Sequence, residues 1–81
     1  MQLEIITPDK TLFDGTAKSV TLPATGGNFQ LLENHAPIIS TLKSGKIKIV
    51  TDSDTQLIEI SGGVVEMMKN RVIILAEPAK Q

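Results

Sequence analysis

The stretch GKIKIVTDSDTQLIEI, residues 45–60, decides the fold class of this chain. Its first part alternates strictly, with Ile47 and Ile49 separated by lysine, as in a β-strand that buries one face and exposes the other. The residues Asp52–Asp54 then interrupt this pattern, and all of them favour turns. Apolar residues resume more densely at Leu57–Ile60, which we expect to lie more centrally in a sheet. The stretch therefore predicts a β-hairpin.

Turn-forming residues recur along the rest of the chain at intervals of about one strand length. They lie at Pro8–Asp9, Asp14–Gly15, Gly26–Gly27, Asn34, Ser44–Gly45, Asp52–Asp54, Gly62–Gly63 and Lys69–Asn70. The segments between them alternate with period two or, as at Arg71–Leu75, are densely apolar and expected near the centre of a sheet. No stretch shows the apolar stripe of a helix. Because a small sheet must bury its apolar face, the sequence predicts an all-β fold, a flattened β-sandwich or barrel of two sheets.

The composition limits the function classes open to the chain. Its 81 residues suffice for one domain with a small core, in which a deep substrate cleft is not expected. The net charge of −1 gives no long-range attraction to nucleic acid or to an anionic membrane surface. The absence of cysteine excludes disulfides and thiolate chemistry. The longest apolar run, Val72–Ala76, is far shorter than the roughly 20 residues of a membrane helix, and no secretory signal is evident at the start.

His35 is the only histidine and the first candidate for catalysis or metal binding. A general base requires an orienting carboxylate and a nucleophile, but Ser61 lacks the preceding glycine that a nucleophile elbow requires. One histidine without cysteine or a second histidine also makes a poor zinc site. We therefore expect His35 to hold a loop or to lie in an interface. The sequence predicts neither enzyme activity nor a bound cofactor or metal.

Other patterns resemble binding motifs only in part. Asp52 and Asp54 open like a calcium loop, but Leu57 and Gly63 occupy the positions of its glycine and glutamate. The glycine pattern of a nucleotide-binding loop is absent. The lysines within residues 43–48 form a basic cluster, but a chain with so few aromatic residues offers no stacking platform for bases. These lysines more simply indicate a solvated face.

Lys69 supports one alternative function. It follows Met68 at an expected turn, and the modified lysine of biotinyl and lipoyl carrier domains also lies on a hairpin tip. In biotinyl domains that lysine stands between two methionines, whereas here Asn70 follows it. The chain after Lys69 is also too short for the second half of such a fold. A carrier domain modified at Lys69 is the alternative hypothesis.

Several short motifs occur in a fixed order over nearly the whole chain. They are Leu3–Pro8, Leu12–Gly15, Leu22–Ala24 before Gly26–Gly27, Asn34–Pro37, Leu42–Gly45, Ile60–Gly63 and Ile74–Glu77. Through these motifs the sequence from Leu3 to Glu77 resembles the epsilon subunit of F-type ATP synthases, whose mitochondrial counterpart is called delta. The resemblance implies a sandwich of two sheets with about ten short strands. It also implies that residues 1–77 form the β-sandwich domain found at the N-terminus of epsilon subunits, and that residues 78–81 are a frayed tail.

The resemblance further implies a function without catalysis. The family's domain belongs to the rotor, or central stalk, of a proton-translocating ATP synthase. It binds the gamma subunit and the membrane c-ring, so that rotation of the ring is coupled to ATP synthesis. The resemblance implies no bound nucleotide and no nucleic acid, and contact with the membrane only through the complex. In a bacterium such a subunit lies peripherally on the cytoplasmic face of the inner membrane.

Individual site residues carry over from the family by position. Those matching Thr7, His35 and Ser40 lie on the gamma-facing side, and the one matching Asn28 lies on the loop that meets the c-ring. The family often has a carboxylate at Asn28 and usually has glycine at Gln30. Asparagine still donates and accepts hydrogen bonds, so we expect Asn28 to contact the ring. Typical bacterial members continue into two C-terminal helices, and we expect this chain to be a naturally short member without them.

Overall fold

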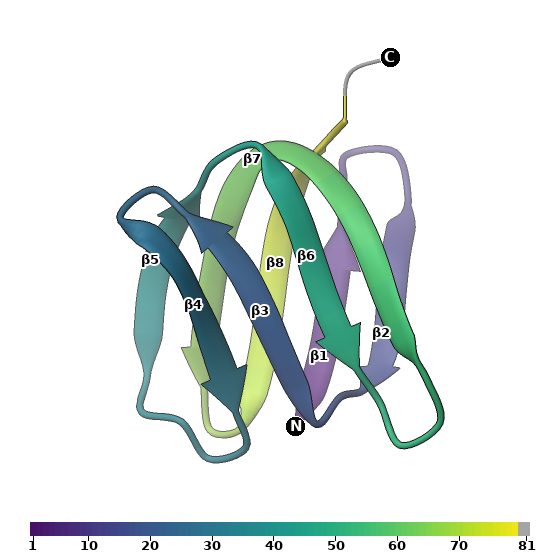
Figure 1. The fold of residues 1–81 in the computed structure, drawn as a ribbon, viewed down its shortest axis with the longest axis vertical. Helices are drawn as coiled ribbons and strands as arrows, with labels where there is room; N and C mark the ends of the chain where they lie inside the picture. Colours follow the sequence, from purple (N-terminus) through teal and green to yellow (C-terminus); the bar gives the residue numbers. More distant parts are fainter. Residues whose placement is uncertain (80–81) are drawn as a thin grey trace.

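The computed structural model describes residues 1–79 as eight strands joined by short connections (Figure 1). The strands are β1 (Gln2–Ile6), β2 (Thr11–Thr16), β3 (Ser19–Ala24), β4 (Gly27–Leu32), β5 (Ile38–Leu42), β6 (Gly45–Val50), β7 (Thr55–Met68) and β8 (Arg71–Pro78). In this described part no helix is long and apolar enough to cross a membrane. The prediction of an all-β, sandwich-like fold is confirmed.

One folded sheet supplies both layers of the sandwich. The first layer has the order β2–β1–β8–β7–β5, in which β1 and β8 pair in parallel. The second layer contains β4, β3, β6 and the first half of β7. β7 is 14 residues long and belongs to both layers, while the pair Ala24–Leu42 joins β3 to β5 at another corner. Figure 1 shows β3, β4 and β6 lying across the strands of the first layer.

The core lies between the two layers and follows the period of two. In β6, for example, Ile47 and Ile49 are buried while Lys46 and Lys48 are exposed, as the opening stretch predicts. The buried apolar residues are Met1, Leu3, Ile5, Ala17, Val20, Leu22, Ala24, Leu31, Leu42, Ile47, Ile49, Ile60, Val65, Met67, Val72, Ile74 and Ala76. Fully burying a leucine or isoleucine contributes about 1.5–3 kcal/mol, so this cluster supplies the main driving force for folding.

The structure differs from the sequence-based expectation at Gly62 and Gly63. We expected this pair to end a strand, but β7 continues through it with an irregularity in its pairing to β8 between Ile60 and Gly62. The two glycines therefore mark a β-bulge at which the strand passes from one layer to the other. This pair separates no strands, and the expected turn at Asp14–Gly15 likewise lies inside β2. The structure has eight strands in the described residues and not about ten.

The position of Leu57–Ile60 also corrects an expectation. We placed this segment near the centre of a sheet, but the first half of β7 pairs with β6 and, apart from Ile60 opposite Pro78, has no partner strand on its other side among the described residues. It forms the edge of the second layer. Leu57 is accordingly 60% exposed. The expectation for Arg71–Leu75 is correct, since β8 lies between β1 and β7. β8 includes Pro78, one residue beyond the expected domain boundary, and the last two residues of the expected tail lie outside the described residues.

Candidate partner-binding surface

The outer face of the first layer carries several exposed apolar side chains. Four of its large side chains are strongly exposed: Ile39 at 72%, Leu75 at 55%, Met68 at 53% and Val64 at 39%. The half-buried Ile6 and Ile73 lie on the same side of β1 and β8. We call these six residues the apolar face.

The strand register places three residues of the apolar face in one row across three strands. Val64 of β7 lies opposite Leu75 of β8, which lies opposite Ile6 of β1. In the next outward-facing row, Glu66 lies between Ile39 of β5 and Ile73 of β8. Single exposed apolar residues are common on protein surfaces, but a connected group indicates a contact surface.

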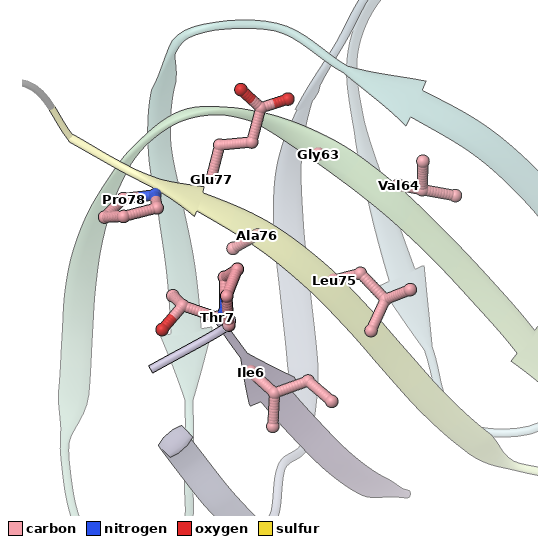
Figure 2. A pocket seen from close by; sticks show the side chains of 9 residues that line it. Ile6, Thr7, Gly63, Val64, Leu75, Ala76, Glu77 and Pro78 are labelled. Atoms are coloured by element: carbon pink, nitrogen blue, oxygen red, sulfur yellow. The ribbon is translucent and has the colours of Figure 1, made fainter. Parts of the chain in front are cut away.

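A shallow groove of about 510 Å³ lies at one end of the apolar face. Its lining residues are Ile6, Thr7, Pro8, Gly63, Val64, Leu75, Ala76, Glu77 and Pro78. Figure 2 shows Val64 and Leu75 on one side of the groove and Thr7 with Pro78 on the other. The lining is mostly apolar, so the groove is suited to an apolar side chain of a partner.

Thr7 closes the loop between β1 and β2. Its Oγ1 accepts hydrogen bonds from the backbone N–H groups of Asp9 at 3.3 Å and Lys10 at 3.1 Å. The same hydroxyl donates to the carbonyl oxygen of Lys10 at 3.1 Å. Thr51 makes the same set of bonds to its own turn after β6. The polar atoms of Thr7 thus stabilise a turn, and its half-buried side chain contributes to the groove.

His35 lies at the opposite end of the first layer, in the loop between β4 and β5. The backbone N–H of His35 donates to the carbonyl oxygen of Leu32 at 3.2 Å, and Asn34 between them has φ 62°. A positive φ at the third position is the requirement of a type II turn, which asparagine tolerates. The ring is exposed, and its Nδ1 lies 2.7 Å from the carbonyl oxygen of Ala36. Among the described residues the imidazole has this backbone partner and no carboxylate or hydroxyl partner.

Ser40 and Asn28 lie on other surfaces. Ser40 is opposite the buried Val65 and therefore faces the inner side of β5, at the edge of the layer, where its Oγ donates to the carbonyl oxygen of Thr41 at 3.2 Å. Asn28 is exposed near the start of β4, in the second layer. The turn before it is held to β5, because the Thr25 N–H donates to the Thr41 carbonyl oxygen at 3.2 Å.

The structure therefore does not bring the expected site residues together. Thr7 lies in the β1–β2 loop and His35 in the β4–β5 loop, at opposite ends of the first layer. Ser40 faces the inner side of β5, and Asn28 lies on the other layer. The apolar face itself is the feature that the sequence interpretation missed. Its only indication in the sequence is that Val64, Met68 and Leu75 alternate with core residues without being polar. Among the described residues, no group of three or more His, Cys, Asp or Glu could hold a metal ion.

Comparison with known proteins gives consistent matches over the whole chain. The family model for the "ATP synthase, Delta/Epsilon chain, beta-sandwich domain" matches residues 1–81. The ATP synthase epsilon chain of Chlorobaculum tepidum is 41% identical over 76 residues, which are 93% of this chain and 86% of that protein. The epsilon chain of Chlorobium limicola is 39% identical over 94% of this chain and 88% of its own length.

Other relatives are longer than this chain. The ATP synthase epsilon chain of Thermosynechococcus vestitus is 37% identical over 100% of this chain, which spans 59% of that protein. Solved structures support the same fold at low sequence identity. A chain of the Euglena gracilis mitochondrial ATP synthase matches with a TM-score of 0.85 and 18% identity, over 91% of this chain and 48% of that one. A chain of the Tetrahymena thermophila mitochondrial ATP synthase central stalk and c-ring matches with a TM-score of 0.80 and 20% identity, over 94% and 62%.

Lys69, the residue of the alternative hypothesis, does lie at the tip of the β7–β8 hairpin. Its position on a turn thus agrees with the expectation from the sequence. The family match nevertheless spans the whole chain and is to ATP synthase subunits. The comparisons therefore give a carrier function of Lys69 no support.

Proposed function

Because this chain belongs to the family of ATP synthase delta and epsilon chains, we propose that it is a rotor subunit that bridges the gamma subunit and the c-ring. Membership of the family confirms that the chain is a non-catalytic subunit of the complex and not an enzyme. In the proposed arrangement the apolar face binds gamma, and the β3–β4 turn with Asn28 meets the ring. The chain holds no nucleotide or cofactor and reaches the membrane only through the complex. In a bacterial cell it lies on the cytoplasmic face.

The single observation that carries the proposal is the apolar face. Ile39, Met68 and Leu75 are each more than half exposed in the isolated chain. Full burial of an exposed side chain of this kind contributes about 1.5–3 kcal/mol. These side chains are already partly covered, so each contributes a fraction of that to a contact with a partner. Thr7 lines the groove at one end of this surface, and the β4–β5 loop with His35 lies at the opposite end of the first layer, which supports their expected place beside gamma.

The proposed contact with the c-ring requires polar groups, whereas the contact with gamma is apolar. The polar loops of a membrane ring offer hydrogen-bonding groups, and Asn28 presents both a donor and an acceptor to solvent. The adjoining turn is fixed, because Thr25 and Thr41 are joined through their hydroxyls at 3.0 Å as well as through the backbone. The ring contact thus lies on a different layer from the gamma contact, as a bridge requires.

A bridge that transmits torque must also resist deformation. β7 passes from one layer to the other without a break, so the two layers that carry the contact surfaces share a continuous strand. Densely packed interiors have few alternative arrangements and transmit strain. The fold therefore suits a mechanical role between the shaft and the ring, with proton flow through the ring driving rotation.

Site-directed photocrosslinking in the assembled ATP synthase tests this assignment. A photoreactive residue in place of Ile39 is expected to crosslink to gamma, and one in place of Asn28 to the c subunit. A probe at Ser53, on the exposed β6–β7 turn, is the control for nonspecific labelling. Labelling of one and the same subunit from positions 39 and 28, or labelling no stronger than from position 53, would refute the two-surface arrangement.

A further inference from the structure

The turn between β7 and β8 is built from two residues in the left-handed conformation. Lys69 has φ 53° and Asn70 has φ 60°, between the paired residues Met68 and Arg71. Two positive φ values in a two-residue hairpin define a type I′ turn, which favours glycine at the second position. Glycine would therefore satisfy the backbone at position 70 at least as well as asparagine. What asparagine adds is its side chain.

The side chain of Asn70 reaches a distant loop. Its Oδ1 accepts a hydrogen bond of 2.8 Å from the backbone N–H of Asn34, which is 36 residues earlier in the chain. The carbonyl oxygen of Asn70 also accepts from the N–H of Gln2 at 3.1 Å, so the turn is itself fixed to β1. A stable part of the first layer thereby holds the loop that carries His35.

The loop has few other attachments. Apart from the bond to Asn70, residues 33–37 make one hydrogen bond to a distant residue within the described part of the chain. In it the Met1 amino group donates to Glu33 Oε1 at 3.2 Å. The bond from the His35 N–H to the Leu32 carbonyl oxygen lies within the loop and closes its turn. That turn leaves the Asn34 N–H unused, and Asn70 satisfies it.

We propose that Asn70 is a positioning residue for the docking surface. By holding the Asn34 amide it fixes the β4–β5 loop, and with it His35 and the start of β5, in the conformation that meets gamma. This inference rests on the proposed function. An interface that finds its loop already ordered avoids the entropic cost of ordering it on binding. Loss of the Asn70 side chain should therefore weaken binding although Asn70 itself need not touch gamma.

The Asn70→Gly variant tests the inference, because glycine retains the turn and removes the acceptor. In a titration with gamma, we expect Asn70→Gly to bind roughly fivefold more weakly than the wild type. This decrease corresponds to the loss of one hydrogen bond. Asn70→Asp retains the acceptor oxygen and is expected to bind like the wild type. In the free chain, hydrogen exchange of the Asn34 amide should be faster in Asn70→Gly, while exchange in β7 and β8 stays unchanged.

Combination with His35→Ala separates positioning from general stability. If Asn70 acts through the loop, Asn70→Gly should weaken binding less in the His35→Ala background than in the wild type. Equal effects in both backgrounds, or wild-type binding by Asn70→Gly, would overturn the positioning role alone. Failure of the wild-type chain to bind gamma would instead overturn the proposed function, and this inference with it.

Discussion

The Gly63→Ala variant is expected to lose about 3 kcal/mol or more of folding stability. Gly63 has φ 154°, in the region that side chains rarely adopt. An added Cβ would lie 2.5 Å from the Leu75 carbonyl oxygen and 3.2 Å from the Ala76 Cα. Both are backbone atoms of β8, so no side-chain rotation relieves the contact. Since small domains have total stabilities of roughly 5–15 kcal/mol, the loss is a large fraction of the whole.

Urea unfolding of matched glycine variants measures this effect. Gly26→Ala is the control, because its Cβ would have no neighbour within 4 Å and its φ lies outside the left-handed region. Gly27 has φ 126° but equally open surroundings, so Gly27→Ala isolates the conformational cost, about 1–2 kcal/mol. We expect the order Gly26→Ala, Gly27→Ala, Gly63→Ala from most to least stable. A midpoint for Gly63→Ala equal to that of Gly26→Ala would show that the bulge does not require glycine.

The Ile39→Lys variant is expected to reduce affinity for gamma at least 100-fold while folding normally. Ile39 is 72% exposed on an edge strand, where lysine is well tolerated in the free chain. In the proposed complex, however, the ammonium group would be buried in an apolar contact, with the carboxylate of Glu66 opposite it. Removing two charged groups from water costs several kcal/mol, which exceeds the effect of losing the isoleucine contact alone.

Leu57→Lys is the control for this experiment, with its lysine opposite Lys48 where a lysine at position 39 would lie opposite Glu66. Leu57 is 60% exposed and also lies on an edge strand, but in the second layer, away from the apolar face. Titration of gamma with both variants, together with their melting temperatures, separates binding from folding. Similar affinities for Ile39→Lys and Leu57→Lys would show that gamma does not bind through the apolar face.

Local patterns predicted much of this fold. The alternation around Ile47 and Ile49 identified a half-buried strand, and the turn residues identified most strand ends. The sequence did not predict which layer each strand belongs to, because that depends on pairings between distant segments. The sequence at Gly62–Gly63 is equally compatible with a turn and with a bulge. Only the pairing of β7 with both β6 and β8 decides between them.

The candidate surface was harder to predict for a related reason. A continuous apolar run such as Val72–Leu75 has the same sequence pattern whether one or both faces of its strand are buried. In the folded chain Leu75 is 55% exposed because no third layer covers it. The bond between Asn34 and Asn70 was beyond sequence reasoning altogether, since local spacing does not reveal a contact across 36 residues.

The central claim is that this chain couples the shaft to the ring, and proton-driven ATP synthesis in reconstituted vesicles tests it most directly. ATP synthase assembled without the chain should synthesise little ATP, and addition of the wild-type chain should restore synthesis. The Ile39→Lys chain should fail to restore it, whereas the Leu57→Lys chain should succeed. Full proton-driven synthesis by the complex without this chain would contradict the account.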